Sequence, residues 1–231
     1  QGVMAAMAVS CSGDDVASFE AAATKAVLML FWQGLRIQAG SLRFAEHQHQ
    51  RGVRPPATAT PMLSVRGLTQ AQLTKVVAKA NAVNAHKRAA AAQTLVSLVS
   101  TGRPLDPLEA SMYDMQVSLV NDATKCVVTG PPAALSDLRK FLTKKYAEVT
   151  DEQSRTPHSK RRARVGTLFL NVSACFHHSG NALAVNQLVA DMERLNISWK
   201  CSEMSFPVLS TVDGSDLRSS GAADGGGDDI T

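Results

Sequence analysis

Apolar positions at helical spacing dominate the first sixty residues. Residues 1–10 are small and apolar, which predicts a short buried helix packed closely on its neighbours. Large apolar residues recur at intervals of three and four from 19 to 37, which predicts a longer amphipathic helix. The polar stretch from 47 to 60 contains two consecutive prolines and predicts a loop.

Between 61 and 173 the pattern changes to short apolar runs that alternate with helical stretches. Such runs of four to eight residues, bounded by turn residues, are typical of strands. The second and third runs are separated only by a turn at Asn121 and Asp122, which predicts that these two strands are adjacent. The four predicted strands are 62–65, 117–120, 126–129 and 167–173.

Helix-start signals precede two helices in this region. Thr69, with Gln72 three residues later, has the spacing of a capping box. Pro131 and Pro132 predict the start of a second helix, because proline is tolerated in the first helical turn. The alanine-rich stretch 89–115 is interpreted as an insertion that carries an extra helix.

The order of these elements predicts the fold class and the domains. A β-α-β-β-α-β order is typical of a ferredoxin-like subdomain, here spanning 61–173. The helices on either side need another surface to cover their apolar faces, so 1–60 and 174–218 are assigned to a second body. From 219 to 231 the sequence consists mainly of Gly, Asp, Ala and Ser, which predicts a disordered tail.

Composition narrows the possible function classes. The chain has 231 residues, 45% of them hydrophobic, and a formal net charge of +4. Much of this excess lies in one basic run, 160–164, which lacks interleaved aromatic residues and argues against nucleic-acid binding. The four cysteines form no CxxC pair, so neither a zinc site nor a disulfide framework is indicated. We expect a reducing, cytoplasmic setting, without metal or membrane.

Seven short segments stand out, in order along the chain. They are QG at 1–2, LFWQGLR at 30–36, PMLSV at 61–65 with LTQ at 68–70, SLVN at 118–121 with VVTGPP at 127–132, QSR at 153–155, FH at 176–177, and FPV at 206–208 with DGSDLR at 213–218. Together they resemble the acetyltransferase domain of fungal-type fatty acid synthase β chains. Each segment is weak evidence by itself, but together they extend over most of the chain. The stretch 89–115 is not covered.

The resemblance implies a fold, a reaction and partners. The fold is an α/β-hydrolase-like acyltransferase body, of which this chain holds a part, with a ferredoxin-like insert. The reaction is transfer of an acyl group from coenzyme A to acyl carrier protein in fatty acid or polyketide synthesis, through a serine acyl-enzyme. Implied partners are acyl carrier protein, acetyl-CoA or malonyl-CoA, and other synthase domains. No cofactor is permanently bound, since acyl-CoA is the substrate.

The first segment bears on the nucleophile. In the family, Gly-His-Ser precedes this position and completes a G-x-S-x-G elbow, which exposes the serine at a helix N-terminus. We therefore expect the chain to be a fragment that begins just after the serine and is inactive as it stands. By the same resemblance, the backbone N–H of Gln1 belongs to the oxyanion hole. Gly2 allows the elbow to pack closely.

The candidate general base is His177, which follows a predicted strand and precedes a helix. The resemblance places the base of the family here. The family usually has Pro before the Phe and Ser after the His, whereas this chain has Cys175 and His178. His178 is the second candidate for the base, and a surface or capping histidine is the alternative for either residue. Cys175 is interpreted as a small buried residue rather than a nucleophile.

Two further residues are candidates for substrate binding. Asn121 matches a family asparagine and is expected to support the active-site loop, although a turn residue between two strands is an equal alternative. Gln33 occupies the helical position where malonyl-specific relatives have an arginine. A neutral residue there favours acetyl or another neutral acyl group, because a buried malonyl carboxylate would lack its counter-charge. Arg36, one turn away, leaves malonyl open.

Two other classes of function stay open beside the acyltransferase. One is a catalytically dead remnant that packs in a larger assembly or binds carrier protein. The other is a serine hydrolase with the same elbow, which would require an acidic residue to orient the histidine. Asp151 and Glu152 precede His177, but they lie in the loop that matches the Gln-Ser-Arg segment of the family.

Overall fold

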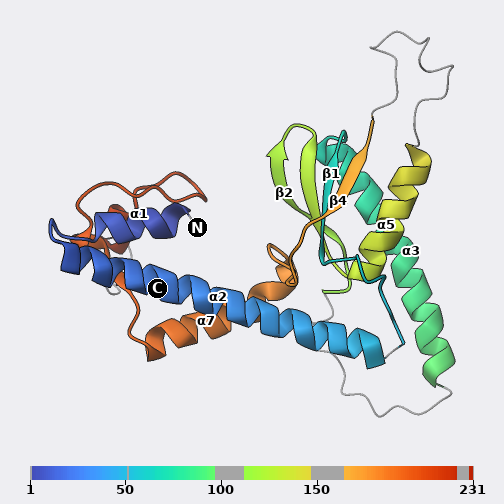
Figure 1. Ribbon diagram of the computed structural model, residues 1–231, viewed down its shortest axis with the longest axis horizontal. Coiled ribbons are helices and arrows are strands. Elements are labelled where there is room, and N and C mark those ends of the chain that lie inside the picture. Colours follow the sequence, from blue (N-terminus) through green and yellow to red (C-terminus); the bar gives the residue numbers. More distant parts are fainter. Residues whose placement is uncertain (1, 51, 97–111, 147–163, 223–228, 231) are drawn as a thin grey trace, which may run out of the picture. The chain divides into compact units, whose positions relative to one another are not determined.

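The computed structural model describes residues 2–50, 52–96, 112–146, 164–222 and 229–230 (Figure 1). The chain divides into two compact units. The first unit comprises Gln1–Arg36 and Leu183–Thr231, and the second comprises Ile37–Ala182. The division falls within the long helix α2 (Val16–Gln50) and at the start of helix α7 (Ala182–Arg194), rather than at the boundaries of 60 and 173 expected from the sequence.

Helices dominate the first unit. Helix α1 spans Gly2–Ser10, and its small residues allow Met7 and Ala8 to be buried, as the apolar pattern predicts. This helix, the first part of α2 and α7 share one hydrophobic core, in which Met192 and Trp199 are almost fully buried. Shorter elements complete the unit: strand β5 (Trp199–Lys200) pairs with β6 (Asp229–Ile230), and two 3-10 helices are η3 (Cys201–Glu203) and η4 (Leu217–Ala222).

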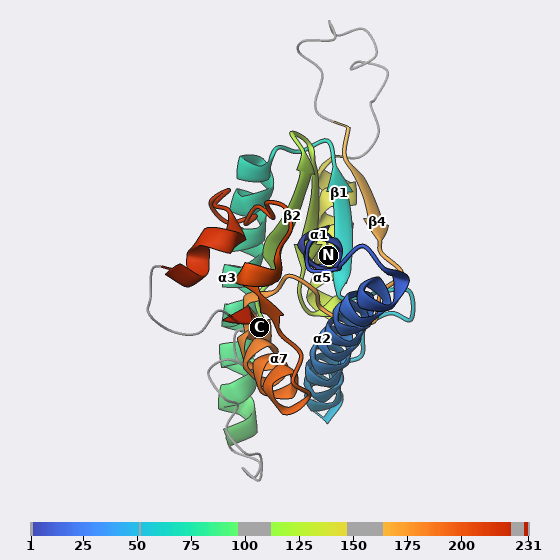
Figure 2. The same ribbon diagram turned by 90° about the vertical axis from the view of Figure 1, so that its left-hand side faces the viewer.

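A four-stranded antiparallel sheet forms the centre of the second unit. Its strands are β1 (Met62–Arg66), β2 (Gln116–Asp122), β3 (Lys125–Thr129) and β4 (Gly166–Phe169), in the spatial order β2-β3-β1-β4. Helices α3 (Gln70–Val96) and α5 (Pro132–Lys145) lie on the same side of the sheet (Figures 1 and 2). Apolar residues of both helices pack on alternate residues of the strands. The predicted pairing of 117–120 with 126–129 is confirmed, as Val117 pairs with Val128.

The predicted helix starts are confirmed. The Gln72 N–H donates to Thr69 Oγ1 at 3.3 Å, and the Thr69 N–H donates to Gln72 Oε1 at 3.0 Å. This reciprocal pair satisfies two amides that have no partner within helix α3. Helix α5 begins at Pro132, and its Leu135, Leu138 and Leu142 are buried against the sheet.

Two helices extend further than the sequence pattern predicts. Helix α2 continues to Gln50, because the signal that ends it is Gly52, in the left-handed region with φ of 75°. The Gly52 N–H donates to His49 O and the Val53 N–H to Gln48 O, the pair of bonds that closes a helix end. The polar character of 47–50 therefore marks the last turn of the helix rather than a loop.

The extra helix expected in 89–115 is part of α3. The alanine run has high helix propensity and no helix breaker precedes it, so α3 continues through it to Val96. The rest of the proposed insertion, 97–111, lies outside the described residues. In the predicted tail, η4 and β6 form where we expected disorder, and 223–228 and 231 lie outside the described residues.

Strand β4 ends at Phe169, whereas the sequence predicts a strand to 173. Its partner β1 begins at Met62, after Pro61, which has no N–H for further pairing. The Leu170 N–H donates to Met62 O at 3.0 Å, and the chain then leaves the sheet. Residues 170–178 therefore form an irregular segment that carries the candidate base. The 3-10 helix η2 (Ser179–Asn181) follows, and α7 begins at Ala182.

Candidate active site

Hydrogen bonds within the second unit hold the segment that follows β4. The Ser173 hydroxyl donates to Gln38 Oε1 at 2.7 Å, and the Cys175 N–H donates to the Ser41 hydroxyl at 3.0 Å. Asn181 Nδ2 donates back to Cys175 O at 2.7 Å. Both ends of the short stretch 175–181 are thereby tied to each other, and the stretch forms a closed turn.

His177 lies in the middle of this turn and is exposed to solvent. Its backbone has φ of 55°, in the left-handed region that few non-glycine residues adopt. This conformation costs a residue with a Cβ atom about 1–2 kcal/mol. Among the described residues, the His177 ring has no hydrogen-bond partner. The turn therefore places a free imidazole at the surface of the unit, at an energetic cost.

His178, the next residue, has the opposite environment. Its side chain is buried, and Nδ1 accepts a hydrogen bond from the Gly180 N–H at 3.0 Å. Its Nε2 lies 2.8 Å from Asp114 O, which can only accept. The partners therefore assign the neutral tautomer with the proton on Nε2. Burial also lowers the pKa of His178.

The chemistry of the two histidines differs accordingly. A general base needs an unshared electron pair that a substrate can reach. In His178 that electron pair is occupied by the Gly180 N–H and the ring is buried, whereas the His177 ring is open. Of the two residues considered as the base, the structure leaves His177 available for proton transfer.

Gln116, at the start of β2, forms the opposite wall of the turn. Its Oε1 accepts from the Ser179 N–H at 3.1 Å, and its Nε2 donates to the Ser179 hydroxyl. Asp114, whose carbonyl binds His178, is two residues away on the same approach to the strand. The turn is thus attached to β2 through two neighbouring residues, His178 and Ser179.

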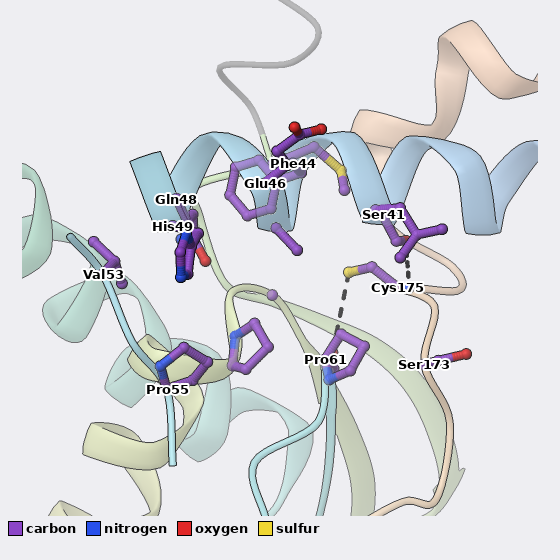
Figure 3. Close-up of a pocket in the computed structure, with 15 residues that line it drawn as sticks. Ser41, Phe44, Glu46, Gln48, His49, Val53, Pro55, Pro61, Ser173 and Cys175 are labelled. Atoms are coloured by element: carbon purple, nitrogen blue, oxygen red, sulfur yellow. Dashed lines mark hydrogen bonds between the residues drawn. The ribbon is translucent and has the colours of Figure 1, made fainter. Parts of the chain in front are cut away.

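An apolar pocket of about 540 Å³ lies beside the segment that leads to the turn (Figure 3). Ser41 and Cys175, joined by a hydrogen bond, form one part of its wall, and Phe44, Val53, Pro55 and Pro61 form others. The size and apolar lining are typical of pockets that take small organic ligands. Burial raises the pKa of the Cys175 thiol to about 12, which confirms a small buried residue rather than a nucleophile.

Asn121 does not lie near the turn. It is exposed in β2, next to the β2–β3 hairpin, whereas the turn binds to Gln116 at the other end of that strand. Asn121 lies five positions after Gln116 along the strand, which corresponds to about 17 Å at 3.4 Å per residue. Within the described residues Asn121 makes no side-chain hydrogen bond. Asn121 lies within β2, which runs to Asp122, so it is not a turn residue between the two strands either.

Gln33 and Arg36 lie in the first unit, on α2. Gln33 is exposed. Arg36 forms two hydrogen bonds with the buried Asp191 of α7, from Nε at 2.6 Å and from Nη2 at 2.8 Å. Arg194 reaches the same carboxylate at 3.3 Å. These hydrogen bonds hold the pKa of Asp191 below its usual range and raise that of Arg36, so this guanidinium already has its counter-charge.

The remaining expectations from the sequence concern Gln1, the cysteines, metal binding and membrane-spanning helices. Gln1 lies outside the described residues. All four cysteines are free thiols, in agreement with the absence of CxxC pairs. In the part of the chain that the structure describes, no three His, Cys, Asp or Glu side chains are grouped to hold a metal. None of the helices there combines the length and apolarity needed to cross a bilayer.

Sequence reasoning missed the residues that hold the turn. Gln116 sits in a strand, where a polar residue normally indicates only a solvent-facing position. Asp114 contributes a backbone carbonyl, which any residue type could supply. Ser41 lies on a helix far away in sequence. The only available signal was the pair His177-His178, in which two adjacent histidines left open that one of them has a structural role.

Comparisons with known proteins show which protein family the chain resembles. Residues 1–105 match a family model described as "Starter unit:ACP transacylase in aflatoxin biosynthesis". The chain is also similar over nearly its whole length to fungal fatty acid synthase β subunits. The chain therefore resembles a segment of the fungal fatty acid synthase β subunit, and the resemblance found in its motifs is confirmed.

The individual relatives are distant. The chain is 30% identical to fatty acid synthase subunit beta of Saccharomyces cerevisiae over 226 residues, and 33% identical to that of Schizosaccharomyces pombe over 231 residues. Each match covers 94% of this chain but only 10% and 9% of the relative, so the chain spans about a tenth of their length. Among solved structures, FabD from Acinetobacter baumannii shares 12% identity with a TM-score of 0.45, over 92% of this chain and 45% of that chain.

Proposed function

We propose that the protein to which this chain belongs transfers an acyl group from coenzyme A to acyl carrier protein through a serine acyl-enzyme, with His177 as the general base. The observation that carries this proposal is the exposed His177 imidazole, held in a left-handed turn at the end of a strand. Such a cost in backbone energy is typical of functional positions. In the pattern of the family, the serine directly precedes the position of Gln1, outside this sequence.

In each half of the proposed reaction, His177 accepts one proton from the attacking group and donates it to the leaving group. His177 takes the proton of the serine hydroxyl as the oxygen attacks the thioester carbonyl, and the Gln1 N–H donates to the oxyanion. When the C–S bond breaks, the imidazolium returns the proton to the leaving sulfur of coenzyme A. In the second half, the carrier thiol gives its proton to His177 and attacks the acyl-serine, and the serine oxygen leaves protonated.

We further propose that the second unit contains the ferredoxin-like insert of an α/β-hydrolase-like acyltransferase body. The element order β-α-β-β-α-β and the antiparallel strand order β2-β3-β1-β4 support this assignment. The position of both helices on one side of the sheet also supports the assignment to a ferredoxin-like insert (Figure 2). The proposed partners are acyl carrier protein, acyl-CoA and other synthase domains in the cytoplasm, and the reaction uses no permanently bound cofactor.

The proposed substrate is an acyl group without charge, such as acetyl. A carboxylate that leaves water needs a cationic partner, and arginine is the usual one because it binds in two places at once. Gln33 is neutral, and Arg36 is already paired with Asp191. The pairing of Arg36 with Asp191 supports a neutral acyl group as the proposed substrate.

Replacing His177 in the full parent protein tests the reaction. With His177→Ala, we expect the rate of acyl transfer from labelled acetyl-CoA to carrier protein to fall by about 10²–10⁴, the usual effect of losing a general base. The matched control is His86→Ala, because His86 is an exposed histidine on α3 of the same unit. Wild-type rates in His177→Ala would refute the assignment of the base.

A substitution at Gln33 tests the proposed substrate. In the parent protein, Gln33→Arg should shift the preference from acetyl toward malonyl by about one to two decades, since hydrogen bonds to a charged group contribute about 1.5–3 kcal/mol. The measurement is competition between labelled acetyl-CoA and malonyl-CoA for loading of the enzyme. The control is Gln50→Arg, at an exposed glutamine in the last turn of the same helix, α2. If the unmodified protein already prefers malonyl, the proposal for Gln33 is wrong.

A further inference from the structure

We propose that His178 is a positioning residue that holds His177 in its left-handed conformation and so determines where the catalytic imidazole lies. This inference rests on the proposed role of His177 in acyl transfer. The related family usually has a serine directly after the base, and this chain has His178 there instead. The inference gives that difference a function.

The first argument is the geometry of the turn. His178 connects its two sides, because Nδ1 accepts from the Gly180 N–H within the turn and Nε2 donates to Asp114 O outside it. One ring thereby fixes the backbone after His177 to the approach of β2. A serine side chain is too short to make both connections, which span the width of an imidazole.

The second argument is the cost of the conformation at His177. A residue with a Cβ atom returns from the left-handed region to the ordinary one unless the neighbouring residues prevent it. On the C-terminal side of His177, the bonds that prevent it come from His178, Ser179 and Asn181. Of these three side chains, only that of His178 is buried, so its hydrogen bonds are protected from competition with water.

The third argument excludes a purely apolar role for the ring. A buried histidine that only fills space would leave its nitrogens without partners, at a cost in desolvation. Both nitrogens of His178 have partners, and each has the opposite role, one accepting and one donating. The ring therefore acts as a bridge with a defined tautomer.

Two conservative variants separate the two hydrogen bonds. In His178→Asn, the amide oxygen can take the place of Nδ1 and accept from the Gly180 N–H, but the side chain does not reach Asp114 O. In His178→Gln, the amide nitrogen can take the place of Nε2 and donate to Asp114 O, but no acceptor is left for Gly180. His178→Ala removes both bonds. His86→Asn, His86→Gln and His86→Ala are matched controls at an exposed position.

The first measurement is independent of enzyme activity. Hydrogen exchange of the Gly180 amide, followed by NMR on this chain, should be slow in the wild type and in His178→Asn. It should be at least tenfold faster in His178→Gln and His178→Ala. Exchange of the Leu63 amide in the core reports whether each variant is folded. Unchanged Gly180 exchange in folded His178→Gln and His178→Ala would overturn the bridge.

The second measurement is acyl transfer by the parent protein. We expect kcat to fall about tenfold in His178→Asn and His178→Gln and further in His178→Ala, with KM for acetyl-CoA changed less than twofold. A positioning residue acts on the chemical step, so the effect appears in kcat. If kcat of both folded Asn and Gln variants stays within twofold of wild type, the positioning role is wrong. Should His178→Ala fail to fold, the Asn and Gln variants decide.

The two proposals can fail separately. Full activity in His177→Ala would remove the base, and with it the proposed function, whatever the exchange data show. Loss of activity in His177→Ala together with normal activity in all folded His178 variants would preserve the base and overturn only the positioning role. Loss in both, with rapid Gly180 exchange in His178→Gln, is the expected result.

Discussion

Among the residues that the structure describes, two turns hold a non-glycine residue in the left-handed region, with nearly the same backbone angle. His177 in the second unit has φ of 55°, and Asn196 in the first unit has φ of 53°. Asparagine is one of the residues that tolerate this conformation best, because its short polar side chain bonds locally. The two turns differ in what stabilises them.

The turn at Asn196 is a helix end. The Asn196 N–H donates to Glu193 O at 3.1 Å and the Ile197 N–H to Met192 O at 2.9 Å, which is the usual way in which a helix such as α7 closes. Ile197 and Met192 are both buried in the core of the first unit. Backbone bonds and apolar burial therefore suffice, and no special side chain is needed.

The turn at His177 does not end a helix. It leads into the 3-10 helix η2, for which the buried His178 is the N-cap, and Gln116 of β2 also holds it. The difference teaches that the same backbone angle can be a by-product of helix termination in one place and a position maintained by dedicated polar contacts in another. The second kind is the better indicator of a functional residue.

The largest expected effect on stability concerns the apolar support of the Asn196 turn. Ile197→Ala should lower the free energy of unfolding by about 2–4 kcal/mol, because it leaves a cavity in the core of the first unit. Leu195→Ala is the matched control, as Leu195 is 36% exposed and should cost less than half as much. Chemical denaturation followed by circular dichroism measures both. Equal losses of unfolding free energy in the two variants would show that the burial of Ile197 does not stabilise this turn.

Glycine at the two left-handed positions should have opposite consequences for function. At each position, the Gly variant should be more stable than the Ala variant by about 1 kcal/mol, because only glycine adopts this conformation without cost. In the parent protein, Asn196→Gly should retain acyl transfer, whereas His177→Gly should lose it. Thermal unfolding and the transfer assay provide the two measurements. An Ala variant at 177 as stable as Gly would mean that the conformation is not costly there.

The smallest effect is a dependence of stability on pH that only the His177 turn should show. Burial lowers the pKa of His178 in the folded state, with the carbonyl and charge of Asp114 opposing this shift in part. The unfolded chain then binds more protons than the folded one, so stability falls as pH drops below about 6.5 toward the lowered pKa.

The measurement compares unfolding free energies at pH 7.5 and at pH 5.5. One such group contributes at most about 1.4 kcal/mol per pH unit. The decline should be smaller in His178→Asn, which has no titratable ring, and unchanged in Asn196→Gly. If the unfolding free energy declined equally in His178→Asn and in the wild type, other titrating groups would be the cause.

Local signals were sufficient to predict much of the second unit. The capping box of Thr69 and Gln72 and the prolines before α5 depend on residues close in sequence, and the structure contains both. The polar residues before Gly52 predict too early an end for α2. The helix ends where Gly52 adopts the left-handed conformation. Residues close in sequence thus predict which helices and strands form, but not how long they are.

The support of the candidate site could not be predicted in the same way. His178 binds the carbonyl of Asp114, 64 residues earlier, and Cys175 binds Ser41, 134 residues earlier. A carbonyl is present at every residue, so no side-chain pattern marks the partner of His178. Which of two adjacent histidines stays exposed depends on these long-range contacts, and only the folded structure contains them.

The raised pKa of Cys175 has a practical consequence for chemical labelling. With a pKa raised by burial to about 12, this thiol is almost entirely protonated at neutral pH, and the side chain is buried as well. Alkylating reagents and mild oxidants attack the thiolate, so they should leave this residue unmodified while the pocket wall stays folded. Cys11, the one partly exposed cysteine of the four, is then the first choice for attaching a fluorophore, and an alkaline buffer is needed because burial raises the pKa of its thiol as well. A dye placed there reports on the first unit without altering the segment that carries His177.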